Sequence, residues 1–180
     1  MFTKSSNNIN TKHVHNQRGD IVISAILVIV ILAVIGLFAY KTYEKGMEKT
    51  RVNSAVSEIQ EISQGIQQLY ANSHDFSTID TATVIAAGIA DKSSVVSNKI
   101  ISPWYSGNKD SIVDVLPATN PTTFTIQMAG VPKDSCSLVA APFLSQGTTT
   151  VNANGTAVST PADLAKNCAT KDPATISVSF

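Results

Sequence analysis

The feature that most constrains this chain is a run of twenty residues without a charge, from Ile21 to Tyr40. Within it, only the hydroxyl of Ser24 and the phenol of Tyr40 depart from apolar side chains and glycine. A helix of this length is about 30 Å long, which matches the hydrocarbon layer of a bilayer. A buried core helix this apolar would need a large surrounding protein, and the rest of the chain is too polar to supply one. The run is therefore predicted to span a membrane.

The segment before this run is basic: it carries Lys4, Lys12 and Arg18 but no Asp or Glu. By the positive-inside rule it stays in the cytoplasm, which sends the carboxyl-terminal part of the chain outward. A secretory signal would have a shorter apolar core followed by small residues at a cleavage site, and no A-x-A pattern follows this run. Any cleavage is therefore predicted before the run, at the junction of Arg18, Gly19 and Asp20.

The remaining composition fits one small exported domain. The chain has 180 residues, 43% of them hydrophobic, which leaves room for one compact domain beside the anchor. Removing the three basic residues of the leader from thirteen leaves ten, against thirteen acidic residues. This net negative balance predicts no nucleic-acid partner.

Two cysteines, Cys136 and Cys168, lie in the part predicted to be outside the membrane. In an oxidising compartment they are expected to form a disulfide. The chain-entropy model assigns about 3–4 kcal/mol to closing a loop of roughly thirty residues. A metal site would need more ligands than two thiols and a distant His74, so no metal is expected.

After the apolar run, the same helix is predicted to continue to about Asn72 as an amphipathic segment. One apolar stripe recurs at intervals of three and four residues. Its members are Val52, Ala55, Val56, Ile59, Ile62, Ile66, Leu69 and Tyr70. Charges of both signs between the run and the stripe, from Lys41 to Lys49, are expected to be solvated or interfacial. Gly46 and Gly65 each weaken a helix by about 1 kcal/mol relative to Ala, which allows bending near Gly46.

The remaining chain predicts a mixed α+β domain. Segments rich in β-forming residues occur at 111–116, 123–129 and 175–180. Helices are predicted at 81–88, 132–141 and 160–168, with Asp80 and Thr160 capping the first and the last. Trp104, the single tryptophan, lies in a loop and is expected to pack against the long helix. Together these elements predict an antiparallel sheet laid over the amphipathic half of the helix.

No pattern of catalytic residues stands out in the sequence. It contains no H-E-x-x-H, no G-x-S-x-G and no phosphate-binding glycine loop. His13 and His15 lie in the leader, and His74 beside Asp75 is interpreted as a helix-terminal residue. The chain is therefore predicted to be neither an enzyme nor a cofactor-binding protein.

Three further segments carry a resemblance to a known family. They are NKIISPWYSG at 98–107, VPKDSCSLVAAPF at 131–143 and DLAKNCATKDPATISVSF at 163–180. Together with the basic leader that ends in Gly and the apolar run, they resemble the type IVb pilins. This branch includes bundle-forming pilin, toxin-coregulated pilin and the thin-pilus pilins of conjugative plasmids.

The resemblance implies the α+β type IV pilin fold, in which a long amino-terminal helix packs on an antiparallel sheet above a disulfide-bounded carboxyl-terminal region. It divides the chain into a leader at 1–19, a transmembrane and filament-core half of the helix at 20–40, an amphipathic half at 41–73, and a globular pilin domain at 74–180.

The resemblance also implies a route to a filament. A prepilin peptidase would cut between Gly19 and Asp20 and methylate the new amino terminus at Asp20. The pilin would wait in the inner membrane of a Gram-negative bacterium until an assembly ATPase and platform complex extract it. It would then join a helical homo-oligomer that passes an outer-membrane secretin and becomes an extracellular pilus for adhesion, aggregation or conjugative mating contact. The core residues would be Ile21, Val22, Ile26, Leu27, Val30, Ile31 and Val34.

One departure from the family concerns docking between subunits. Family pilins usually carry Glu at the fifth mature position, and counting from Asp20 that position holds Ser24. Our hypothesis is that Asp20 takes over the pairing with a neighbour's amino terminus. The rival explanation is a minor pilin that starts or caps the fibre.

Two other protein classes share part of this pattern. A type II secretion pseudopilin has the same opening helix, and a bitopic membrane protein with a periplasmic binding domain has the same hydropathy. The segment 147–160, low in charge and rich in Thr, Asn and Gly, is expected to be a surface loop that holds any contact specificity.

Overall fold

The computed structural model describes residues 18–107, 110–147 and 149–180, and the side chains of 18–25 and of Lys41 are not part of that description. The chain forms two compact units, Met1–Glu44 and Lys45–Phe180. Most of the predicted leader, residues 1–17, lies outside the described residues.

The long helix predicted from the sequence is present as α1, which spans Arg18–Leu69 over 52 residues. It starts and ends a few residues earlier than expected, and it continues through Gly46. Among the described residues it is also the one helix that is long and apolar enough to cross a membrane. The weakening expected at Gly46 therefore does not interrupt the helix.

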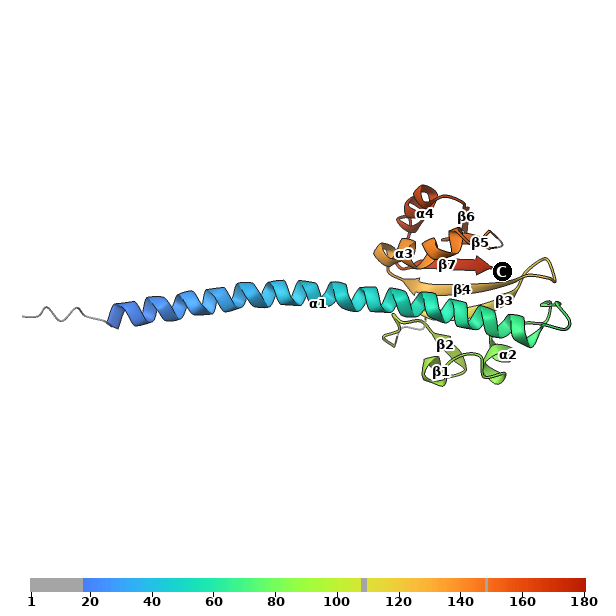
Figure 1. The fold of residues 1–180 in the computed structure, drawn as a ribbon, viewed down its shortest axis with the longest axis horizontal. Helices are drawn as coiled ribbons and strands as arrows, with labels where there is room; N and C mark the ends of the chain where they lie inside the picture. Colours follow the sequence, from blue (N-terminus) through green and yellow to red (C-terminus); the bar gives the residue numbers. More distant parts are fainter. Residues whose placement is uncertain (1–17, 108–109, 148) are drawn as a thin grey trace, which may run out of the picture. The chain divides into compact units, whose positions relative to one another are not determined.

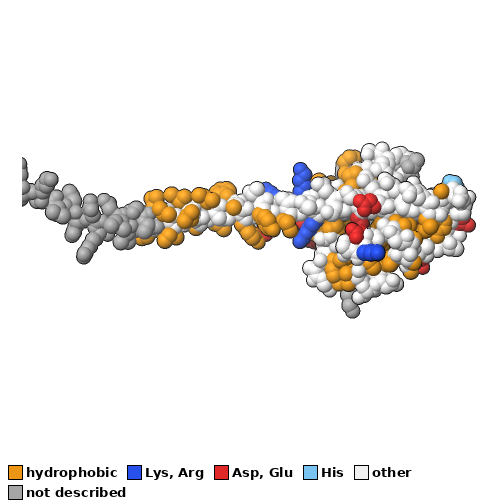
Figure 2. Space-filling model, turned by 60° about the horizontal axis from the view of Figure 1, so that its bottom comes forward, with side chains coloured by type: hydrophobic (Ala, Val, Ile, Leu, Met, Phe, Trp, Pro, Cys, Tyr) orange, Lys and Arg blue, Asp and Glu red, His pale blue; other side chains and the backbone are white. Residues whose placement is uncertain are grey.

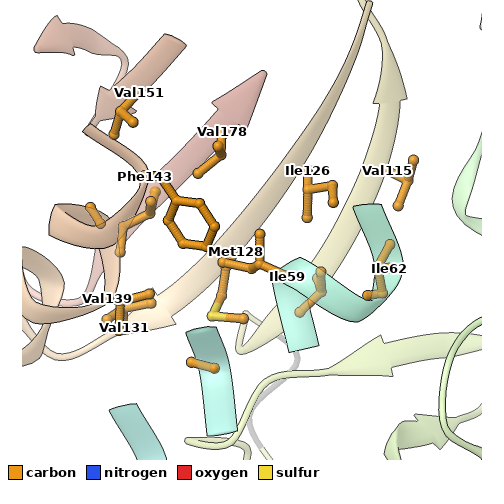
Figure 3. Close-up of a cluster of buried hydrophobic side chains, with 14 of the residues drawn as sticks. Ile59, Ile62, Val115, Ile126, Met128, Val131, Val139, Phe143, Val151 and Val178 are labelled. Atoms are coloured by element: carbon orange, nitrogen blue, oxygen red, sulfur yellow. The ribbon is translucent and has the colours of Figure 1, made fainter. Parts of the chain in front are cut away.

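In the second unit, α1 buries one apolar stripe against the sheet. Val52, Ala55, Ile59, Ile62 and Ile66 are all buried and follow one another at intervals of three and four residues, as the pattern predicts. Figure 3 shows Ile59 and Ile62 pointing toward strand side chains of the core. The stripe ends earlier than expected, because Leu69 at the end of the helix is 51% exposed.

The sheet of the second unit contains seven strands within the described residues, and every neighbouring pair is antiparallel. The strands are β1 (Val95–Val96), β2 (Lys99–Ile101), β3 (Ile112–Pro117), β4 (Phe124–Val131), β5 (Thr150–Ala153), β6 (Thr156–Val158) and β7 (Ala174–Ser179). Their spatial order is β1-β2-β3-β4-β7-β5-β6, so the last strand lies between β4 and β5 (Figure 1). The three predicted strands are confirmed as β3, β4 and β7.

The prediction of a surface loop at 147–160 is wrong in part, because this segment contains the β5–β6 hairpin at the edge of the sheet. Asn154 and Gly155 form its turn with φ angles of 52° and 80°. Two consecutive positive φ values are typical of a type I′ turn, for which Asn-Gly is the favoured pair. Val151 and Ala153 are buried, so the hairpin belongs to the core despite the polar composition of its sequence.

At two positions in this unit, a glycine allows a neighbouring residue to approach the backbone closely. Gly130 has φ of 76° beside the register shift in β4, and a β-carbon there would collide with Ser111. Gly65 lies where the side chain of Ile89 packs onto α1, and a β-carbon there would collide with that side chain. Gly65, which weakens the helix by propensity, is therefore required by packing.

Three shorter α-helices complete the second unit: α2 (Thr81–Ala86), α3 (Lys133–Leu144) and α4 (Pro161–Cys168), with a 3₁₀ turn η1 at Lys92–Ser94. The predicted caps are confirmed: the Asp80 side chain accepts a hydrogen bond from the Thr83 N–H at 2.7 Å, and the Thr160 hydroxyl accepts one from the Asp163 N–H at 3.1 Å. The helix predicted at 132–141 is also confirmed and continues for one more turn than expected.

A row of aromatic rings joins the end of α1 to the carboxyl terminus. Tyr70 contacts Phe76 at 5.4 Å between ring centroids, and Phe76 contacts Phe124 at 4.9 Å. Phe124 then stacks on Phe180 at 5.5 Å, and Phe180 meets Phe143 of α3 edge-on at 6.1 Å. Phe180 is thereby held against the core, since each such aromatic pair adds about 0.5–1.5 kcal/mol beyond burial.

Candidate assembly surface

The most unusual surface of the protein is the apolar part of α1 from Ile26 to Tyr40, which we call the apolar assembly helix. Every side chain in it is exposed, and its large hydrophobic residues are between 46% and 70% accessible. Figure 2 shows apolar side chains covering this part of the helix. A helix that is hydrophobic all round is stable only inside lipid or among other apolar helices. This surface therefore requires one of these two environments.

The described positions predicted for a filament core lie on this helix and are exposed: Ile26, Leu27, Val30, Ile31 and Val34. The remaining predicted positions are Gly19, Asp20, Ile21, Val22 and Ser24, which belong to α1 by their backbone. Their side chains lie outside the described residues, so the docking role of Asp20 and Ser24 stays a prediction.

In the second unit, a carboxylate ties α1 to the globular domain. Glu48 Oε1 accepts a hydrogen bond from Trp104 Nε1 at 2.9 Å and a second, short one from the hydroxyl of Ser135 at the start of α3. Its other oxygen lies 4.0 Å from a guanidinium nitrogen of Arg51. One residue of α1 therefore contacts both the loop after β2 and the helix that carries Cys136.

Glu48 refines the prediction that the charges from Lys41 to Lys49 are solvated or interfacial, because its partly exposed carboxylate also binds the globular domain. Trp104 does pack against α1, as expected, and is only 8% exposed, while Ser135 is 1% exposed. These partners lie 56 and 87 residues away from Glu48 in the chain. The i,i+3 and i,i+4 charge pattern of a helix carries no signal for such distant partners, so the sequence could not reveal this network.

Cys136 of α3 and Cys168 of α4 form a disulfide, with an S–S distance of 1.99 Å and both residues buried. The bond joins two helices whose cysteines are 32 positions apart. Nearby, the side chain of Asn154 donates to the Asn167 carbonyl at 2.8 Å and accepts from the Thr175 N–H at 2.9 Å. The disulfide therefore fixes α4 to α3, and the Asn154 amide connects α4 with the hairpin and with the last strand.

The histidine singled out from the sequence lies at the surface of the described structure. His74 is exposed in the turn after α1, with φ of 49°, and Asp75 accepts a hydrogen bond from the Ser77 N–H at 3.0 Å. Hydrogen bonding from the side chain of Ser77, together with this backbone hydrogen bond, lowers the pKa of the Asp75 carboxyl below its ordinary value. Within residues 18–107, 110–147 and 149–180, no group of His, Cys, Asp and Glu is arranged to hold a metal ion.

The long apolar-to-amphipathic helix, the antiparallel sheet behind it and the Cys136–Cys168 bond together define the α+β fold of the type IVb pilins. A solved structure with this fold is the type IVb pilin from Salmonella typhi, which matches with a TM-score of 0.55 at 19% sequence identity. The match covers 70% of this chain and 97% of that one, and at this identity it shows the fold alone.

A comparison of the sequence with family models identifies the family. The model of the family described as PilS N terminal matches residues 49–179, which is most of the chain, and the protein therefore belongs to this family of type IVb pilins. A comparison with curated protein sequences finds no significant match.

Proposed function

We propose that this protein is a structural subunit, and the major one, of a type IVb pilus. The single observation that carries this proposal is the apolar assembly helix, exposed on all sides, in a chain whose folded unit is a pilin domain. Such a surface can leave lipid only if it is buried again, because keeping apolar surface out of water contributes about 25 cal/mol per Å² of free energy. Packing against the same helix of other subunits supplies that burial, as the core of a filament.

Processing at Gly19–Asp20 would precede assembly. Cleavage there removes the basic leader and leaves a new amino terminus at the start of the apolar run, where Asp20 is also the expected methylation site. The leader's positive charges favour the cytoplasmic side of the inner membrane, so removing them makes it easier to withdraw the helix outward. The peptidase, the assembly ATPase with its platform, and the secretin are the partners that this route requires, and the final location is an extracellular filament on a Gram-negative bacterium.

Each segment of the chain has its own proposed role. The segments are the leader at 1–19, the core helix at 20–40, the amphipathic helix at 41–73 and the pilin domain at 74–180. The Glu48 network and the buried disulfide stabilise the domain that would coat the filament, for which we propose a structural role. Adhesion, aggregation and conjugative contact all remain compatible uses of such a filament.

The test is the intact mass and amino-terminal sequence of the protein in a sheared surface fraction, measured with and without reduction. The proposal expects filaments whose chains begin at Asp20 and gain about two mass units on reduction of one disulfide. A protein that begins at Met1 and stays with the membrane would instead be a signal-anchored periplasmic domain.

A minor pilin is the second candidate, and the observation that favours it is Ser24 at the position where the family usually has Glu. A minor subunit at a fibre end has no subunit ahead of it to dock on, so it would not need that carboxylate. Quantifying the protein in purified filaments separates the two candidates: the major subunit dominates the filament mass, whereas a minor one is a trace component.

A further inference from the structure

The second unit contains a cavity of about 670 Å³, open to solvent, that has no part in the proposed filament core. It lies between the amphipathic part of α1, the segment around η1 and the chain just after β2. Three carboxylates line it: Glu58 and Glu61 from α1, and Asp91 at the start of η1. Among the described residues, its lining contains no Lys, Arg or His. The described lining therefore gathers negative charge without a positive side chain.

Burial, with a smaller contribution from the neighbouring negative charges, shifts the pKa of one carboxyl in the cavity. Burial raises the pKa of Glu58 to about 7, the Ser94 hydroxyl opposes this shift, and the negative charges of Glu61 and Asp91 add to it. The other titratable group of the lining is the phenol of Tyr105. A cation in the cavity would favour the ionised form of Glu58 and reverse part of the shift.

Two polar atoms of the lining lack a partner among the described residues. Glu58 Oε1 and Ser102 Oγ are both buried and make no hydrogen bond, and Ser102 as a whole is only 2% exposed. A buried polar atom without a partner costs about 1–3 kcal/mol. Both residues line the same cavity, so the unmet hydrogen-bonding capacity and the unbalanced charge occur together.

The arrangement disfavours a metal ion and favours an organic cation. Within the described residues, the carboxylates are not grouped closely enough to coordinate one metal. Ile62, Ile89 and Pro103 add apolar wall to the lining. An alkyl chain with a terminal ammonium matches this mixture, since its methylenes suit the apolar wall and its three N–H donors suit carboxylate and hydroxyl acceptors.

We propose that this cavity binds a primary alkylammonium group, with Glu58 as the main charge partner. Two sources share this chemistry: a free diamine or polyamine, and the lysine side chain of a second copy of the chain. The proposal concerns the folded unit Lys45–Phe180 and stands whether or not the protein forms pili.

The first experiment uses the full chain in detergent micelles and pentane-1,5-diamine as the probe. Isothermal titration at pH 8 is expected to show saturable binding that an equal ionic strength of NaCl does not reproduce. Glu58→Gln should weaken the affinity at least tenfold. Asp134→Asn removes the same charge from an exposed position outside the lining and should change the affinity less than twofold.

Proton linkage supplies a second readout. With a pKa of about 7, roughly a tenth of Glu58 is ionised at pH 6 and most of it at pH 8, so affinity should fall about tenfold between pH 8 and pH 6. Binding at pH 7 should release about half a proton, measured from the dependence of the heat on the buffer's ionisation enthalpy. Glu58→Gln should abolish both effects, while Glu61→Gln should keep the proton release with weaker binding.

Self-association of the same samples separates the two sources. If pentane-1,5-diamine dissociates oligomers of the full chain and Glu58→Gln weakens them, the natural ligand is a lysine of a second copy. If the diamine binds and the oligomeric state is unchanged, the ligand is a free amine. The proposal is overturned by heats that NaCl reproduces, or by equal affinities for the wild type, Glu58→Gln and Asp134→Asn.

Discussion

Replacing Glu48 by Ala removes the acceptor that joins α1 to both Trp104 and Ser135. Hydrogen bonds to a charged group contribute about 1.5–3 kcal/mol each when buried, and a donor left unpaired costs a similar amount. The Glu48 side chain is 36% exposed, so water can replace part of the interaction. We therefore expect the free energy of unfolding to fall by about 2 kcal/mol, which is a large share of the stability of a small domain.

The assay is urea denaturation of the full chain in detergent, followed by the emission of Trp104, the single tryptophan, and independently by far-UV circular dichroism. Two probes are needed because the substitution removes a partner of the reporter itself. Glu48→Gln keeps one acceptor oxygen and should lose only about half as much stability as Glu48→Ala.

Two controls isolate the network from general charge effects. Arg51→Ala breaks only a half-exposed ion pair and should cost less than about 0.5 kcal/mol. Glu61→Gln neutralises an exposed carboxylate on the same helix and should not destabilise the protein. If Glu48→Ala loses no more stability than Arg51→Ala, the network does not hold α1 to the domain and the reasoning is wrong.

Three further predictions concern other sites in the second unit. Gly65→Ala should lower the free energy of unfolding by about 1–3 kcal/mol in urea titrations, because the collision with Ile89 outweighs the gain in helix propensity, and a more stable variant would contradict this packing. Because the pKa of Glu58 is raised to about 7 in the folded state, its protonation stabilises the fold fully below about pH 4.5, and this stabilisation is lost as the pH rises through 7. Between these limits the free energy of unfolding of the wild type should fall by up to about 3 kcal/mol relative to that of Glu58→Gln. Parallel pH profiles of the two proteins would refute this. Replacing Cys136 and Cys168 together by Ser should cost about 2–5 kcal/mol, and an unchanged urea midpoint would contradict it.

The local elements were predictable because their signals are local. The Asp80 and Thr160 caps and the proline at the first position of α4 act within one helical turn, so the sequence placed both helices within a few residues. The buried stripe from Val52 to Ile66 was predictable because the period of a helix determines which residues share a face. The strands β3, β4 and β7 had enough β-branched residues to be recognised.

The edge of the sheet shows where this reasoning failed. The hairpin of β5 and β6 is built from Thr, Asn, Ala and Val in a segment that looks like a polar loop. The hairpin joins the sheet because β5 pairs with β7 along Thr150–Ala153. These two strands are separated in the chain by β6 and α4. The Asn-Gly turn at 154–155 was the one local signal that could have revealed the hairpin.

The sequence by itself determined that a helix apolar on all sides opens the chain, that its second half buries one stripe, and that the family is that of the type IVb pilins. These conclusions rest on composition, period and motifs, which are properties of neighbouring residues. Only the tertiary structure decided that Glu48 binds Trp104 and Ser135, and that Gly65 leaves room for the side chain of Ile89. It also decided that Glu58 lines a cavity whose described lining residues include no positive side chain. The physical reason is that hydrogen bonding, packing and desolvation depend on which distant segments meet, and that is fixed by the fold as a whole.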